Sequence, residues 1–328
     1  MSSILPHSAR GPEGRTPIVF LHGFAGSRET WLGQQIALET RRRTIAFDLP
    51  GHGAALDWPE IGHAGISAKA VIASLSAMGI ERCHLVGHSM GGATAVLVAM
   101  KLAEAERVAS LTLLAPGGFG DEINQRLLRR FAVAVAEHEI HALLEQFFGY
   151  ERPVPLEIAR HMAAERRDPR VTAALARIVE AILDGERQKS FDLSLLGGLP
   201  HPVRLIWGNQ DRVLPTRQSR RAPGTVGVHV FAGVGHMPHL EVPREVTRIL
   251  VETCAAEQTG GRRSGARSGR RSRRPGALMV RHGRNNSALN PPPESDTVRS
   301  RSRPGIGSFR SSGPVGHGGL VGNGAGRS

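Results

Sequence analysis

The chain has 328 residues, room for one or two domains, and a formal net charge of +13. From position 260 onward the chain has fourteen arginines and two acidic residues, whereas residues 1–259 carry 28 basic and 27 acidic side chains. Two cysteines, Cys83 and Cys254, exclude a disulfide framework, and no apolar run reaches the about 20 residues of a membrane span. Because no secretion signal precedes the first apolar run, we expect a cytoplasmic protein.

Short apolar runs rich in β-branched residues alternate with helical patterns along most of the chain. This alternation predicts an α/β fold, with a mostly parallel sheet and helices on both of its faces. The predicted strands are 17–21, 44–47, 83–86, 111–114, 203–207 and 226–231, and the predicted helices are 66–78, 91–103 and 241–254.

Residues 119–192 interrupt the alternation, because they contain helical patterns such as VTAALARIVEAIL and no strand-like run. We interpret them as an all-helical cap inserted between two parts of an α/β core, residues 1–118 and 193–257. Residues 258–328 are rich in Gly, Ser, Arg and Pro, which predicts a disordered tail. Such a basic tail would bind nucleic acid at most without sequence preference.

The hexapeptide GHSMGG at 87–92 lies between a predicted strand and a predicted helix. This context fits a G-x-S-x-G nucleophile elbow, a sharp turn that exposes a serine hydroxyl above the sheet. Gly87 and Gly91 fit the same interpretation, because side chains there would collide with the neighbouring strand and helix. The sequence therefore predicts Ser89 as a nucleophile.

A serine hydroxyl needs a base and a third group that orients the base. In this architecture an acid and then a histidine follow the nucleophile, each just beyond a strand. Asp211 and His236 occupy such positions, the second in a glycine-rich loop. The backbone N–H of Met90 and that of Phe24, in the loop FLHGFAGS, are the predicted oxyanion donors.

Several other residues fit the acid and base roles less well. His239 lies three residues after His236 and remains an alternative base. The remaining candidates are Asp184 and Asp192 at the end of the cap, His229 within a predicted strand, and His138 and His141, which lack zinc-helix spacing.

Five features occur in the order of the α/β-hydrolase pattern: HGF at 22–24, DLPGHG at 48–53, GHSMGG, Asp211 and His236. From residue 17 to about 254 the chain resembles that family. LLAPGGFGDEIN at 113–124 and the helical cap look most similar to the hydrolase-like domain of acetoin dehydrogenase acetyltransferase components. Meta-cleavage-product hydrolases and enol-lactonases resemble the chain less closely.

The resemblance implies a serine hydrolase that cleaves an ester, thioester, lactone or activated C–C bond of a small molecule. An acyl-enzyme would form on Ser89, and no metal or organic cofactor is implied. The alternative is an acyltransferase-like or non-catalytic scaffold associated with a 2-oxoacid or acetoin dehydrogenase-type complex. Oligomeric state is not predicted.

The chain departs from the family at its start, where sixteen residues replace the one or two strands that usually precede the HGF strand. Either the sheet edge is trimmed or the natural chain begins further upstream. The acetoin components also carry a lipoyl domain with a lysine in a tight hairpin. Lys69, Lys101 and Lys189 have no such context, so we expect no lipoyl arm.

Overall fold

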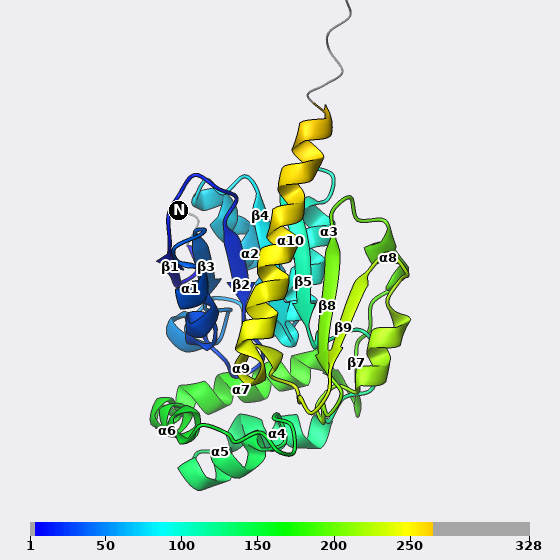
Figure 1. The fold of residues 1–328 in the computed structure, drawn as a ribbon. Coiled ribbons are helices and arrows are strands. Elements are labelled where there is room, and N and C mark those ends of the chain that lie inside the picture. The colour runs from blue at the N-terminus through cyan, green and yellow to red at the C-terminus, as the bar shows by residue number, and fades with distance from the viewer. Residues whose placement is uncertain (1–3, 265–328) are drawn as a thin grey trace, which may run out of the picture. The chain divides into compact units, whose positions relative to one another are not determined.

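The computed structural model describes residues 4–264, with side chains as far as residue 255. One sheet contains seven strands in the order β1-β3-β2-β4-β5-β8-β9 (Figure 1). Only β1 is antiparallel to its neighbour, so the predicted mostly parallel α/β sheet is confirmed. The strands are β1 (His7–Arg10), β2 (Ile18–Leu21), β3 (Thr44–Phe47), β4 (Cys83–His88), β5 (Val108–Leu114), β8 (Val203–Gly208) and β9 (Gly227–Phe231).

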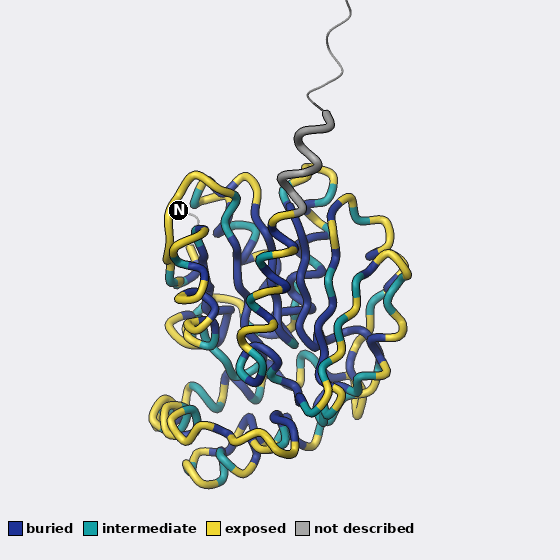
Figure 2. The backbone as a smooth tube through the Cα atoms, in the orientation of Figure 1, coloured by how far each residue is buried: buried dark blue, intermediate teal, exposed yellow. Residues whose placement is uncertain are grey.

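Helices cover both faces of the sheet because successive side chains of its central strands point to opposite sides. On β2, Val19 and Leu21 belong to one core cluster and Ile18 and Phe20 to the other. The first cluster includes side chains of α2 and α3, and the second includes those of α1 and α10. Figure 2 shows the resulting buried centre. The four helices are α1 (Leu32–Leu38), α2 (Ala64–Ala77), α3 (Met90–Leu102) and α10 (Pro243–Ser264).

Helices α4 to α7 of the segment between β5 and β8 lie across the carboxyl ends of the strands (Figure 1). Two of its helices begin at recognisable signals: the Asn124 side chain caps α4, and the Asp168 side chain, followed by Pro169, caps α7. The elements of this segment are α4 (Gln125–Val133), α5 (Glu137–Leu144), α6 (Leu156–Glu165), α7 (Pro169–Ile182), β6 (Leu183–Asp184), β7 (Arg187–Gln188) and α8 (Ser194–Gly197).

Several elements differ from those the sequence predicts. The polar strand β1 forms within the sixteen N-terminal residues, pairing with β3 at the sheet edge. The segment 119–192 is not entirely helical, because β6 and β7 form a small antiparallel hairpin. Further short elements are η1 (Arg28–Trp31), η2 (Gly53–Ala55), η3 (Thr216–Arg221) and α9 (Pro238–Glu241).

The last helix ends later than the sequence indicates. The backbone of α10 continues to Ser264, past residue 257, whereas residues 265–328 of the predicted disordered tail lie outside the described residues. Within residues 4–264, none of the helices has the length and apolar character needed to cross a membrane.

Candidate active site

Ser89 is the single residue between the end of β4 and the first residue of α3, and it has a φ of 52° and a ψ of −116°. A positive φ is costly for a residue with a side chain, so the surrounding structure must impose it. Glycines on both sides make the turn possible. A Cβ at Gly87 would collide with the carbonyl of Gly91, and one at Gly91 with the carbonyl of His22.

His236 follows β9 and pairs with Asp211, which follows β8. The His236 Nδ1 and Asp211 Oδ2 atoms are 2.7 Å apart, and both side chains are almost fully buried. Asp211 also accepts hydrogen bonds from Trp207 Nε1 and from the backbone N–H groups of Val213 and Leu214. The carboxylate is thus an acceptor that places the His236 proton on Nδ1 and leaves Nε2 with a lone pair.

The backbone around His236 is anchored by the buried carboxylate of Glu241. This carboxylate accepts from the N–H groups of Gly235 and Met237, which flank His236, and from that of Gly149. The N–H of His236 itself donates to the carbonyl of Phe147 over 2.6 Å. The histidine loop is therefore fixed from α9 and from the segment between α5 and α6.

Phe24 and Met90, whose backbone N–H groups are the predicted oxyanion donors, line the same cavity as Ser89. Within residues 4–264, neither N–H donates a hydrogen bond to the protein. Gly23 allows the Phe24 loop to approach, because a Cβ at Gly23 would lie 3.2 Å from the Ser89 Cβ. Both N–H groups remain available to a ligand.

Two buried histidines, His22 and His52, hold the backbone near Phe24 through hydrogen bonds. The N–H of Leu49 donates to His22 Nε2 over 2.9 Å, and the N–H of Ala25 donates to His52 Nε2 over 3.1 Å. Burial lowers the pKa of His22 to about 4 and that of His52 to about 3, so both rings are neutral. Their Nδ1–H groups donate to backbone carbonyls of Gly23 and Pro50.

The other candidates from the sequence lie elsewhere. His239 is buried between Trp31 and His88, with ring centroids 4.6 Å from each, and both of its ring nitrogens lack hydrogen-bond partners among the described residues. Burial lowers the pKa of His239 to about 3. The structure therefore pairs Asp211 with His236 and not with His239. The cavity around Ser89 is not lined by Asp184, Asp192, His229, His138 or His141.

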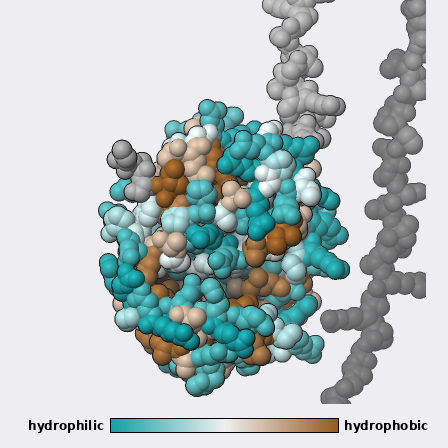
Figure 3. Space-filling model, turned by 90° about the vertical axis from the view of Figure 1, so that its left-hand side faces the viewer, coloured by the Kyte–Doolittle hydropathy of each residue, from teal (hydrophilic) through white to brown (hydrophobic). Residues whose placement is uncertain are grey.

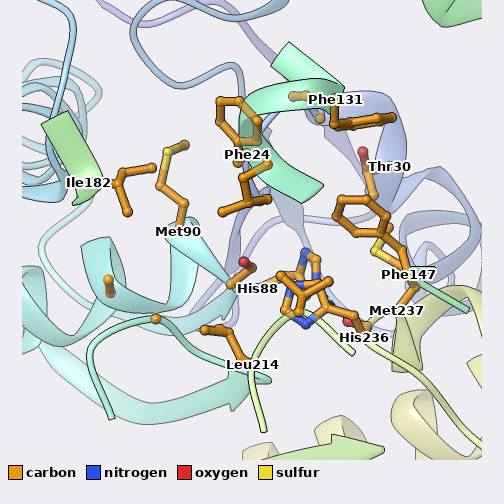
Figure 4. A pocket seen from close by; sticks show the side chains of 18 of the residues that line it. Phe24, Thr30, His88, Met90, Phe131, Phe147, Ile182, Leu214, His236 and Met237 are labelled. Atoms are coloured by element: carbon orange, nitrogen blue, oxygen red, sulfur yellow. Dashed lines mark hydrogen bonds between the residues drawn. The ribbon is translucent and has the colours of Figure 1, made fainter. Parts of the chain in front are cut away.

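A cavity of about 630 Å³ contains Ser89 and His236 among its lining residues. Apolar side chains of the core and of residues 119–192 line this cavity, among them Phe24, Phe131, Phe147 and Ile182, which are labelled in Figure 4. On the face drawn in Figure 3, hydrophobic side chains border a hollow in the lower half of the molecule. The cavity has room for a small organic molecule with an apolar portion.

Titratable side chains also line the cavity, where residues 119–192 meet the core. His161 Nε2, on α6, lies 3.7 Å from Glu29 of η1 and 3.5 Å from Glu165. Burial raises the pKa of the Glu165 carboxyl; His161 opposes this increase, and the nearby Glu29 adds to it.

The sequence alone gives no sign that Glu241, Trp207, His22 and His52 support the site. HGF and DLPGHG pointed to the two loops that contain the histidines, but their partners became visible only in three dimensions. Glu241 and Trp207 occur within ordinary helix and strand patterns, so nothing in their neighbourhood distinguished them.

Residues 18–249 match the alpha/beta hydrolase family. The chain belongs to this family. The resemblance found in its sequence motifs is thereby confirmed.

Three comparisons place the chain among known proteins. It is 37% identical over 241 residues to the dihydrolipoyllysine-residue acetyltransferase component of an acetoin cleaving system from Pseudomonas putida. That match covers 74% of this chain and 64% of the relative, so the chain spans less than two thirds of that protein. A 2-hydroxy-6-oxo-6-phenylhexa-2,4-dienoate hydrolase from Comamonas testosteroni is 26% identical, over 77% of this chain and 92% of the relative.

The solved structure of the hydrolase of the same name from Rhodococcus sp. strain RHA1 superposes with a TM-score of 0.68. The superposition covers 77% of this chain and 95% of that one at 24% identity, which establishes a shared fold.

Proposed function

We propose that the protein is a serine hydrolase with Ser89 as nucleophile, His236 as general base and acid, and Asp211 as the orienting group. The observation that carries this proposal is the His236–Asp211 hydrogen bond of 2.7 Å in a cavity that also contains Ser89 at a positive-φ turn. The Comamonas testosteroni relative, which is named for a hydrolytic reaction, supports the same reaction class.

In the proposed first step, His236 Nε2 takes the proton of Ser89 Oγ as that oxygen bonds to the substrate carbonyl carbon. The carbonyl oxygen becomes an oxyanion, which the N–H groups of Phe24 and Met90 bind. The carbonyl re-forms, the leaving group departs with the proton from His236, and an acyl-enzyme remains. A water molecule then gives its proton to His236 and attacks the acyl carbon, releasing a carboxylic acid and free Ser89.

The proposed substrate is a small ester, thioester, lactone or activated C–C compound with a partly apolar acyl group. Apolar side chains dominate the lining of the cavity, and a large part of them comes from residues 119–192, which we propose act as the cap over the core. This cap would set acyl-group preference, whereas the core would carry the reaction. A cytoplasmic location remains a prediction from the sequence.

The test combines a fluorophosphonate probe with a panel of esters, thioesters and lactones. We expect the probe to label Ser89 and Ser89→Ala to lose about 10³-fold or more of kcat while folding normally. His236→Ala combined with Ser89→Ala should be little worse than either change alone, because the residues act as a unit. A Ser89→Ala protein with most of its activity against the best substrate would refute the assignment.

The relationship to the acetoin-system component favours a second candidate, acyl transfer within a dehydrogenase-type complex. Acyl transfer would form the same acyl-enzyme as hydrolysis, but the acyl group would pass to a thiol and not to water. Turnover of a good ester with and without an added thiol acceptor separates the two, because transfer gives a new thioester and hydrolysis gives only the acid. A non-catalytic scaffold would neither turn over nor take the fluorophosphonate label.

A further inference from the structure

His88 is the last residue of β4 and directly precedes Ser89, yet its side chain contacts a distant part of the chain. Its Nε2 atom lies 2.8 Å from the backbone carbonyl oxygen of His236. Because a carbonyl only accepts, the His88 proton must be on Nε2, and the imidazole donates. Both histidines are labelled in Figure 4.

The surroundings of His88 keep its ring in one orientation. The ring is 3% exposed, and its centroid lies 4.6 Å from that of His239 and 4.9 Å from that of His236. Its second nitrogen faces Gly23, since a Cβ at that position would lie 2.6 Å from His88 Nδ1. Burial holds the pKa of His88 well below its usual range, so the ring is neutral and carries a single proton.

This hydrogen bond links the two groups that the proposed reaction must keep at a fixed separation. The other polar anchors of His236 come from Asp211, which holds its ring, and from Phe147, which accepts its backbone N–H. Among the residues that the structure describes, only His88 links the turn that carries Ser89 to His236 by such a bond.

We propose that His88 is a positioning residue, whose Nε2–H holds the backbone of His236 so that the base stays within reach of Ser89. This inference rests on the proposed hydrolase function. A displacement of about 1 Å at a catalytic group can cost about 10²-fold in rate. Loss of this hydrogen bond should therefore lower kcat and leave substrate binding largely intact.

Three substitutions separate the hydrogen bond from the bulk of the ring. Glutamine places its amide nitrogen as many bonds from the backbone as His88 Nε2, whereas asparagine reaches only the position of Nδ1. Phenylalanine keeps a ring and removes the donor. His239→Phe is the matched control, because that buried ring packs against His88 and its nitrogens lack partners among the described residues.

The measurements are kcat and KM for a p-nitrophenyl ester, fluorophosphonate labelling of Ser89 and the melting temperature of each variant. We expect His88→Asn and His88→Phe to lose about 10- to 100-fold in kcat, with KM changed less than about twofold. His88→Gln should recover most of the lost rate, and His239→Phe should keep the wild-type kcat.

Two results would overturn the proposal: wild-type kcat in folded His88→Phe or His88→Asn, or a loss in His88→Gln as large as that in His88→Asn. If the asparagine variant does not fold, the phenylalanine and glutamine variants still decide. Failure of the hydrolase function itself would be recognised separately, as an active Ser89→Ala protein.

Discussion

At the scale of single residues, the site depends on buried polar groups whose hydrogen bonds leave little freedom. Asp211 accepts from three N–H groups besides the ring of His236. Glu241 accepts from three backbone N–H groups around the histidine loop. Each carboxylate fixes loops that would otherwise move independently, which is the preorganisation that acid–base catalysis requires.

Replacing Trp207 with phenylalanine tests whether these hydrogen bonds position Asp211. The change removes the indole N–H that donates to Asp211 Oδ2 over 2.9 Å. A hydrogen bond to a charged group contributes about 1.5 kcal/mol, so kcat should fall about tenfold. Trp58→Phe is the control, since Trp58 belongs to the core margin and not to this network. Equal kcat values for the two variants would show that the indole N–H does not matter to the base.

The proposed triad could be predicted from the sequence because its members follow strands, and the carboxyl ends of parallel strands meet at one edge. The hydrogen bonds that support the triad could not be predicted in this way. His88 and His236 are 148 positions apart, and no local pattern encodes their contact. Strand β1 was missed for a different reason: HSAR is polar and mostly exposed, so its pairing with β3 leaves no hydrophobic alternation to detect.

At the scale of elements, the proposed cap, residues 119–192, and the core contribute differently to the cavity. Core loops supply Ser89 and His236, and cap helices supply apolar lining such as Phe131 on α4. The boundary between the two contains Glu29, His161 and Glu165, which also line the cavity. Substitutions in this cluster can therefore change both the cavity wall and the contact between the two parts.

Truncation of Phe131 or Phe148 to alanine should shift the preference toward longer acyl groups, because each change enlarges a cavity that both residues line. The measurement is kcat/KM across p-nitrophenyl esters of increasing chain length. Val133→Ala, at an α4 position that is 59% exposed, is the control and should leave the profile unchanged. An unchanged profile in both phenylalanine variants would mean that these side chains only pack.

Glu165→Gln should stabilise the protein at neutral pH. Burial raises the pKa of Glu165 above its ordinary value of 4.5, so the folded state disfavours the carboxylate. This group's contribution to stability therefore falls as the pH rises through the range between the ordinary and the raised pKa. The variant should show a higher melting temperature than the wild type at pH 7 and no gain at pH 4. A gain of equal size at both pH values would exclude ionisation of Glu165 as the cause.

At the scale of the whole molecule, the sheet separates two apolar clusters, and neutral histidines lie buried near the carboxyl ends of its strands. His22, His52, His88 and His239 all have lowered pKa values, chiefly because of burial. Unfolding exposes these rings to water, where they bind protons at an ordinary pKa of 6.5. Acid should therefore lower the stability of the whole fold.

Below pH 6.5 the unfolded state binds more protons at these histidines than the folded state does. By linkage, the free energy of unfolding therefore decreases as the pH falls toward 4. Urea unfolding at a series of pH values between 7.5 and 4.5 should show this decrease. His239→Phe removes one such group, whose pKa is lowered to about 3, and should flatten the dependence while leaving its slope above pH 7 unaltered. An unchanged slope below pH 6.5 would contradict this explanation.

The hydrogen bond from the His236 backbone to the Phe147 carbonyl also bears on how such a protein can diversify. A recombination event that replaced all of 119–192 would import a foreign turn at 147–149 and would displace His236, the proposed base. An exchange restricted to α6 and α7 would leave that turn intact while changing part of the cavity wall. We expect new substrate ranges to arise first in these two helices, with the 147–149 turn the slowest part of the segment to diverge.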